Sequence, residues 1–192
     1  MNLLYDDFPE SIEVNGKTLN ILTDFRDWIM FSDMMFDKNL SNADKLVGAK
    51  RWIEDDIPQS ISISNIFQAL VEFFSCSDMT EKNPATIEGS NKTSKPIFSY
   101  KHDAKYILSA FREVYHINLK TLEYMHWWEF QCLFESLPDT CELKKIMGYR
   151  NINLAEIKDS KERARIGKIQ RCIALPTRME DEDIGDILSG VM

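Results

Sequence analysis

Apolar residues recur along most of the chain at the three- and four-residue spacing that is typical of amphipathic helices. The spacing is bounded by N-capping residues, glycines and prolines at the positions where helices begin and end. The predicted helices cover residues 24–36, 41–53, 62–74, 101–115, 122–137, 141–147 and 160–174. We therefore expect a mainly α-helical, single-domain bundle of six to seven helices.

One short stretch, residues 11–22, has a different pattern. Apolar and polar residues alternate on both sides of the dipeptide Asn15-Gly16. Asn-Gly between alternating residues is a strong signal for a two-residue hairpin turn. The sequence therefore predicts a small N-terminal β-hairpin, which must pack on the helices because an isolated hairpin is only marginally stable.

Residues 122–137 are apolar on nearly every side of a helical wheel. A helix of this kind is normally packed on several sides, so this segment is predicted to be the central helix of the bundle. Thr121 is its expected N-cap, and Pro138 is expected to end it. The side chains expected to be largely buried are those of Trp127, Phe130, Leu133 and Phe134.

Two polar stretches interrupt or follow this pattern. Residues 77–96 contain two prolines and a glycine and have no helical periodicity, which indicates a long mobile loop inserted in one domain of residues 1–176. Residues 177–192 hold five acidic residues against Arg178 and are expected to form an acidic, disordered tail. Four apolar residues of this tail have the spacing of a helix that docks in a groove, and they are candidate partner-binding residues: Ile184, Ile187, Leu188 and Val191.

The predicted helix over residues 24–36 carries more apolar residues than one packing partner would cover. Its inward stripe is expected to contain Phe25, Trp28, Ile29, Met35 and Phe36. The surplus side chains are those of Met30, Phe31 and Met34. Methionine adapts to irregular apolar surfaces, so these three are candidates for partner binding. The alternative is that they face another helix of the same domain.

Composition and charge narrow the class of protein. The hydrophobic content is 44%, the net charge is −8 and the pI is near 5.0, which disfavours general binding to nucleic acid or anionic membranes. Residues 144–171 hold nine Lys or Arg against three Asp or Glu, a local charge of +6. No aromatic residues interleave Lys161, Arg165 and Lys168, so we interpret them as a solvated helix face rather than a nucleic-acid interface.

We expect a cytoplasmic protein without a membrane segment. No apolar run approaches the length of about 20 residues that spans a bilayer, and the first residues lack the pattern of a signal peptide. The four cysteines form no C-x-x-C pair and are expected to be reduced.

The most suggestive chemical pattern is a doubled E-x-x-H, formed by Glu113 with His116 and by Glu123 with His126. Di-iron bundles use such pairs together with further glutamates from other helices. Those glutamates lack suitable positions here, so we expect no metal and interpret His126 as a core residue beside the tryptophans, with one ring nitrogen hydrogen-bonded. The chain has no phosphate-binding glycine motif and no recognisable catalytic triad. We therefore expect neither an enzyme nor a cofactor.

Three stretches carry a family resemblance: FSYKHDAKYILSAFREVYHINL (98–119), TLEYMHWWEFQCLFESL (121–137) and KIMGYRNINLAEI (145–157). The HWW and IMGYR blocks are the most specific parts, and a basic helix ending in ALP (174–176) follows them. Together with the opening LLYDDFPESIEVNGK, they resemble the bacteriophage family called "gene product fifteen", whose members are encoded in the tail module of long-tailed phages of Gram-positive hosts.

The resemblance implies a role in tail assembly. Genes of this family typically precede the gene for the tape-measure protein, which is the position of tail assembly chaperones. The implied partners are the tape-measure protein and other tail proteins in the host cytoplasm. The alternative is a structural tail component that stays in the virion. The family motifs bring no catalytic or ligand residues, and the sequence does not indicate the oligomeric state.

Overall fold

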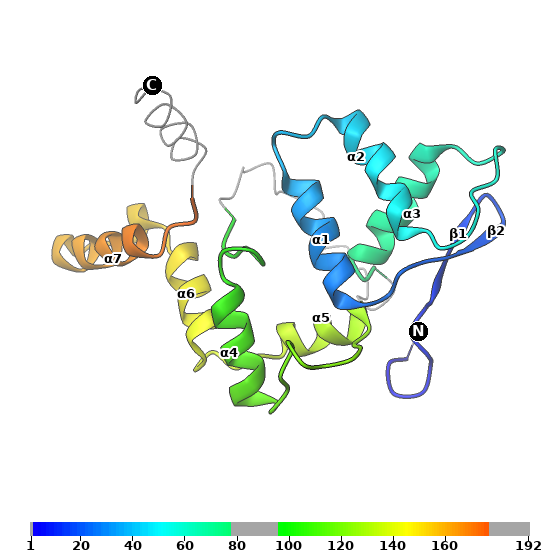
Figure 1. The fold of residues 1–192 in the computed structure, drawn as a ribbon. Helices are drawn as coiled ribbons and strands as arrows, with labels where there is room; N and C mark the ends of the chain where they lie inside the picture. Colours follow the sequence, from blue (N-terminus) through cyan, green and yellow to red (C-terminus); the bar gives the residue numbers. More distant parts are fainter. Residues whose placement is uncertain (1, 78–95, 177–192) are drawn as a thin grey trace, which may run out of the picture. The chain divides into compact units, whose positions relative to one another are not determined.

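The computed structural model describes residues 2–77 and 96–176, which group into two compact units (Figure 1). The described part of unit 1 comprises residues 2–77 and 117–136, and that of unit 2 comprises residues 96–116 and 137–176. Apart from residues 77 and 96, the predicted loop and the predicted acidic tail lie outside the described residues. The single-domain organisation stays a prediction.

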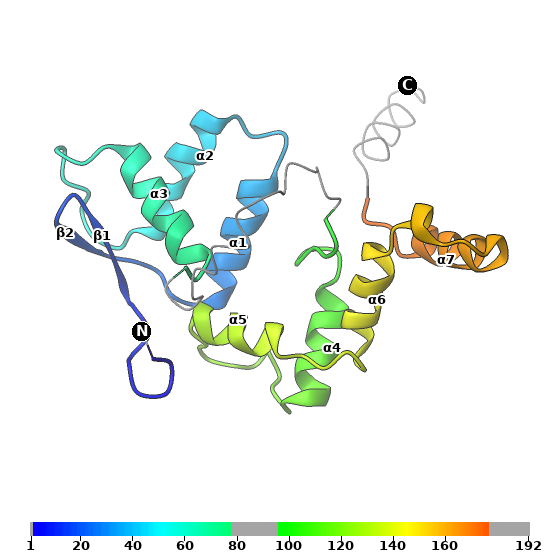
Figure 2. The same ribbon diagram turned by 180° about the vertical axis from the view of Figure 1, so that it is seen from behind.

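Unit 1 contains the β-hairpin and helices from both residues 2–77 and residues 117–136. Its elements are β1 (Ser11–Val14), β2 (Lys17–Asn20), α1 (Phe25–Phe36), α2 (Asn42–Gly48), the 3-10 helix η1 (Ala49–Trp52), α3 (Ile63–Phe74) and α5 (Trp127–Glu135). The strands are antiparallel, with Val14 opposite Lys17. Asn15 and Gly16 both have positive φ, as a two-residue hairpin turn of type I′ requires. β1 packs against α3, which Figure 2 shows from behind.

The core of unit 1 is built mainly from aromatic side chains. The rings of Phe25 in α1 and Phe130 in α5 stack with their centroids 4.9 Å apart. Trp28 is fully buried, and its ring centroid lies 4.6 Å from that of Phe73 in α3. Because α1 contributes to both contacts, its buried side chains connect α3 and α5.

Unit 2 is a smaller helical cluster. Its elements are α4 (Ala104–Val114), α6 (Glu142–Asn151), the 3-10 helix η3 (Leu154–Glu156) and α7 (Ser160–Cys172). α6 contacts both α4 and α7, and η3 also contacts α7. The buried apolar side chains of these helices are Ile107, Ala110, Phe111, Leu143, Ile146 and Ile166.

The described residues contain seven α-helices and the N-terminal hairpin, which confirms the predicted fold class. The capping pair of Ser41 and Asp44 is formed at the start of α2, where each side chain receives a backbone N–H of the other residue. Ser62 caps α3 as its position suggests. α1 begins one residue later than predicted, because Asp24 is its N-cap and the side chain of Asp24 accepts the backbone N–H of Arg26.

The predicted central helix is shorter than its apolar pattern indicated. α5 begins at Trp127, with His126 as the N-cap, so the prediction that it starts at residue 122 is wrong. Residues 125–127 instead pair with residues 23–25 through backbone hydrogen bonds of 3.0 and 2.8 Å. Trp127, Phe130 and Phe134 are buried as predicted, whereas Leu133 is only half-buried.

α6 also differs from its prediction. It runs to Asn151 and passes through Gly148, which was expected to end it. The side-chain amide of Gln170 in α7 donates hydrogen bonds of 2.8 Å to the carbonyls of Tyr149 and Ile152. These bonds satisfy carbonyls at the end of α6, so a contact between helices sets the end of α6 in place of the glycine signal.

Candidate functional site

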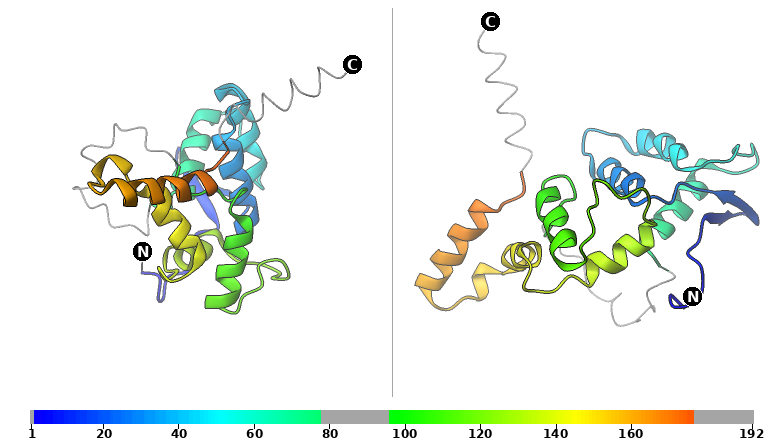
Figure 3. Two further views of the ribbon diagram at one scale, coloured as in Figure 1. Left: turned by 90° about the vertical axis from the view of Figure 1, so that its left-hand side faces the viewer. Right: turned by 60° about the horizontal axis from the view of Figure 1, so that its bottom comes forward.

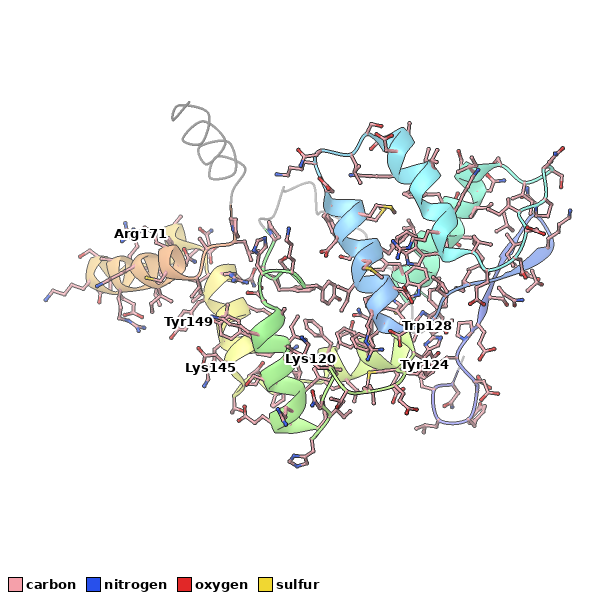
Figure 4. The ribbon with its side chains drawn as sticks, viewed as in Figure 1. Lys120, Tyr124, Trp128, Lys145, Tyr149 and Arg171 are labelled. Atoms are coloured by element: carbon pink, nitrogen blue, oxygen red, sulfur yellow. The ribbon has the colours of Figure 1, made fainter. Side chains whose placement is uncertain are left out.

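Two adjacent tryptophans join the start of α5 to the end of α3. The indole N–H of Trp127 donates to the carbonyl of Phe74 at 3.0 Å, and that of Trp128 donates to the carbonyl of Phe73 at 2.9 Å. The last carbonyls of a helix have no partner within the helix, so the two indoles cap α3. Figure 4 labels Trp128 at this junction. The HWW block therefore has a structural role.

His126 directly precedes the two tryptophans in the sequence. It is buried, as the sequence predicted. Its Nδ1 accepts the backbone N–H of Trp128 at 3.0 Å, and its Nε2 lies 3.1 Å from the carbonyl of Pro9. Because a carbonyl only accepts, the proton of the neutral ring must be on Nε2. The imidazole ring also stacks on the ring of Phe8, with the two centroids 4.8 Å apart. Both nitrogens are therefore occupied, and His126 holds the N-terminal segment against α5.

Burial lowers the pKa of His126, although the Pro9 carbonyl and the charge of Glu10 act in the opposite direction. The neutral form is therefore favoured further at neutral pH. The other member of the doubled motif, His116, is exposed at the end of α4 and has a positive φ. The described parts of the chain contain no group of three or more His, Cys, Asp or Glu that could hold a metal ion.

Arg26 positions the connection that precedes α5. Its Nη2 donates to the carbonyls of Leu119 and Leu122, and its Nη1 lies 3.0 Å from the carboxylate of Asp24. One guanidinium therefore satisfies two loop carbonyls, and that of Leu122 would accept a backbone N–H of the helix if the helix started at residue 122. These bonds explain why residues 119–123 form a loop.

A buried ion pair organises unit 2. Arg150 of α6 makes two hydrogen bonds to Asp103, 2.6 Å from Nη1 to Oδ2 and 2.9 Å from Nη2 to Oδ1. Its Nε also donates to the carbonyl of Ile173 at 2.7 Å, and Nη1 to that of Ile97 at 3.1 Å. The pair links the start of α4, the end of α6 and the end of α7. It accounts for the arginine of the IMGYR block, whose role the sequence did not reveal.

The three surplus apolar residues of α1, which are Met30, Phe31 and Met34, differ in how far they are exposed. Phe31 is fully buried, and its ring centroid lies 5.1 Å from that of Trp52 and 5.5 Å from that of Phe74. It is therefore a core residue, which leaves its side chain no exposed surface for a partner. Met30 is 40% exposed, and Met34 is half-buried beside Gly48.

Other apolar residues at this end of unit 1 are more exposed than Met30. Phe36, which was expected to face inward, is 77% exposed, and Val47 of α2 is 60% exposed. Phe36 is the last residue of α1, where the helix has passed beyond its buried contacts. Leu40, between the two helices, is also exposed. We call Met30, Phe36, Leu40 and Val47 the α1–α2 apolar residues.

Two shallow hollows open to solvent lie on another part of unit 1, with volumes of about 590 and 510 Å³. Tyr124, labelled in Figure 4, lines both hollows and shares a hydrogen bond of 2.8 Å with Thr23. The carboxylates that line them are those of Asp7, Glu10, Asp24, Asp27, Glu54 and Glu129. Burial is the main cause that raises the pKa of Asp27, and the nearby Asp24 adds to it. Because these residues come from separate segments, no local sequence pattern indicates the hollows.

The remaining candidates lie in unit 2 or beyond it. Lys161, Arg165 and Lys168 are exposed on α7, as the sequence predicted. Arg165 pairs with Glu162 at 2.6 Å. The four candidate partner-binding residues of the acidic tail, Ile184, Ile187, Leu188 and Val191, lie outside the described residues.

Within residues 2–77 and 96–176, no helix is long and apolar enough to cross a membrane. Neither a curated protein nor a solved structure matches the chain. One protein family does match, over residues 4–175, and it is described as Bacteriophage Gp15 protein. This match covers nearly the whole chain, including both units and all of the described helices. The chain therefore belongs to the bacteriophage Gp15 protein family.

Proposed function

We propose that the protein is a tail assembly chaperone that binds the phage tape-measure protein in the host cytoplasm before the tail is complete. Two things support this proposal. Membership of a phage family agrees with a role in virion assembly, and the α1–α2 apolar residues give unit 1 exposed side chains that can bind an apolar client. Their exposure is the observation that carries the proposal.

The chemistry of these residues suits a long helical client. A tape-measure protein is a very long helical chain that must stay soluble until tail protein polymerises around it. An aromatic, a methionine and a branched side chain can each cover apolar residues of such a helix, and methionine adapts to different sequences. The proposed action is binding without a chemical step, so it requires neither a catalytic residue nor a cofactor.

Co-expression with the tape-measure protein of the same phage tests the proposal. The unmodified chain should raise the soluble fraction of the client, and Phe36→Glu or Met30→Glu should reduce that effect. Both positions are exposed, so these variants should keep the circular dichroism spectrum of the unmodified protein. Ser64→Glu is a matched control, because it places the same charge at an exposed polar position of α3.

Three results would contradict the chaperone function or its proposed surface. An unchanged soluble fraction of the client with the unmodified chain would contradict client binding. Equal effects of Phe36→Glu and Ser64→Glu would exclude the α1–α2 apolar residues as the surface. Stoichiometric presence of the protein in purified virions, measured by mass spectrometry, would favour a structural tail component instead.

A further inference from the structure

One face of α7 has no packing partner among the described helices of unit 2. α7 contacts α6 and η3, and Ile166 and Gly167 are its buried residues. Both views of Figure 3 show α6 on one side of α7. The opposite face presents Lys161, Ala164, Arg165, Lys168, Arg171 and Cys172, all exposed. We call this set the α7 basic face.

Most of the charge on this face is not neutralised within the described residues. Arg165 is paired with Glu162, and this pair raises the pKa of Arg165 and lowers that of Glu162. The charged groups of Lys161, Lys168 and Arg171 make no hydrogen bond or ion pair with any residue that the structure describes. Three positive charges therefore lie along about three turns of one helix.

The chain that follows α7 has the opposite charge. Residues 177–192 hold Glu180, Asp181, Glu182, Asp183 and Asp186 against Arg178, a net charge of −4 before the terminal carboxylate is counted. The segment starts next to the end of α7, because the bond from Arg150 to the carbonyl of Ile173 fixes the chain there.

The length of the segment matches the face. A helix of 13 residues is about 20 Å long. Seven residues of extended chain, from Pro176 to Asp183, reach about 24 Å. Glu180 can therefore reach Lys168, and Asp183 can reach Lys161. Tethering adds an effective concentration on the order of millimolar, which lowers the affinity that several ion pairs together must supply to hold the segment on the face.

We propose that residues 177–192 dock on the α7 basic face of the same molecule, with the carboxylates of residues 180–186 on Lys161, Lys168 and Arg171. This contact covers the face in the free protein. An acidic partner segment that binds α7 must displace the C-terminal residues first, so the chain carries its own competitor. The proposal concerns unit 2 alone and is independent of client binding by the α1–α2 apolar residues.

Zero-length carbodiimide cross-linking of the full chain tests this contact, because the reagent joins a lysine amine to a carboxylate only when the two groups touch. Cross-linked peptides are identified by mass spectrometry. Links from Lys161 and Lys168 to residues 180–186 should exceed links from the exposed Lys50 and Lys120 severalfold. They should decline in about 0.5 M salt, where the Debye length is well below 8 Å.

Two variants separate docking from the simple proximity of a tethered chain. Lys168→Arg keeps the charge but cannot form an amide link, so links at Lys161 should persist. Lys168→Gln removes the charge, so links at Lys161 should decline severalfold. Equal yields at Lys161 in the two variants, or links spread evenly over all exposed lysines, would overturn the proposal. So would mixed-isotope links from a mixture of ¹⁴N- and ¹⁵N-labelled chains, since these identify docking on a second copy.

Discussion

The guanidinium of Arg150 and the carboxylate of Asp103 form a buried pair with two parallel hydrogen bonds, although the residues are 47 positions apart in the chain. The carboxylate also accepts the backbone N–H of Ser99 at 2.9 Å. Asp103 thus occupies the N-cap position of α4, but its side chain makes no capping hydrogen bond to that helix. Its carboxylate instead fixes α6 and the chain before α4 at one point.

Removal of one member of this pair should be strongly destabilising. Asp103→Ala leaves the Arg150 charge buried without its partner, and such a change typically costs about 3–5 kcal/mol. The free energy of unfolding, measured by urea denaturation, checks this value. The double variant Asp103→Ala with Arg150→Met should be less destabilised than the sum of the single variants. Additive losses would show that the two side chains do not interact.

The two tryptophans at the junction of α3 and α5 allow the contributions of two capping hydrogen bonds to be compared. Trp127→Phe and Trp128→Phe each remove an indole donor, and an unsatisfied buried carbonyl costs about 1–3 kcal/mol. Among the residues that the structure describes, the carbonyl of Phe73 keeps the backbone N–H of Cys76 at 3.1 Å without the indole, whereas the carbonyl of Phe74 keeps the Cys76 thiol at 3.8 Å. We therefore expect the larger loss of unfolding free energy for Trp127→Phe. The opposite order in denaturant melts would argue against capping as the main role of the indoles.

The stability of unit 1 should decline as the pH is lowered. The pKa of His126 is lower in the folded protein than its ordinary value, so the unfolded chain binds more protons in the window below about pH 6.5. The contribution of neutral His126 to the free energy of unfolding is fully present above this window. It is lost as the pH falls through the pKa of His126 in the folded protein. Protonation also removes the acceptor at Nδ1 that caps α5.

Thermal melts at about pH 7.5 and pH 5.5 measure this loss around the ordinary histidine pKa. His126→Ser is the matched variant, because serine can still cap α5 but does not titrate in this range. It should have a lower melting temperature at neutral pH, because the contacts to Phe8 and Pro9 are lost. Its melting temperature should also change less between the two pH values. An equal change in both proteins would assign the pH dependence to other groups.

Gly148 offers a stabilising change. It lies inside α6, it is exposed, and an added Cβ would meet no atom within 4 Å. Gly148→Ala should raise the free energy of unfolding by about 0.5–1 kcal/mol, since alanine loses less conformational entropy in a helix. Urea denaturation gives the value, and a loss of stability would indicate that α6 ends before this residue in solution.

Local signals predicted the elements whose ends are set by neighbouring residues. Asn15-Gly16 predicted the hairpin, because the turn needs positive φ at these two residues alone. The helix predicted from residue 41 has its start there as well, because the capping bonds of Ser41 and Asp44 lie within four residues. The start of α5 was predicted wrongly because Arg26, about a hundred positions away, satisfies the carbonyls of the preceding loop. Such distant donors leave no pattern in the local sequence.

The candidate surface was predicted only in part for a related reason. Helical spacing identified an excess of apolar residues on α1, and Met30 is indeed exposed. It could not separate Phe31 from Phe36, because their burial depends on where η1 and α3 meet the helix. Phe31 is covered by Trp52 and Phe74, whereas Phe36 lies beyond both contacts.

The capping of α3 by α5 has a consequence for the order of folding during synthesis. The carbonyls of Phe73 and Phe74 precede their indole donors by 55 and 53 residues. At ribosomal rates of about 5–20 residues per second, this interval lasts about 3–11 s. During that time, the nascent aromatic residues of α1 and α3 lack their contacts with Trp127 and Trp128, while the first stretch of unit 2, residues 94–116, is being made. The arrival of α5, and not closure of the hairpin, therefore sets the moment when unit 1 can fold on the ribosome.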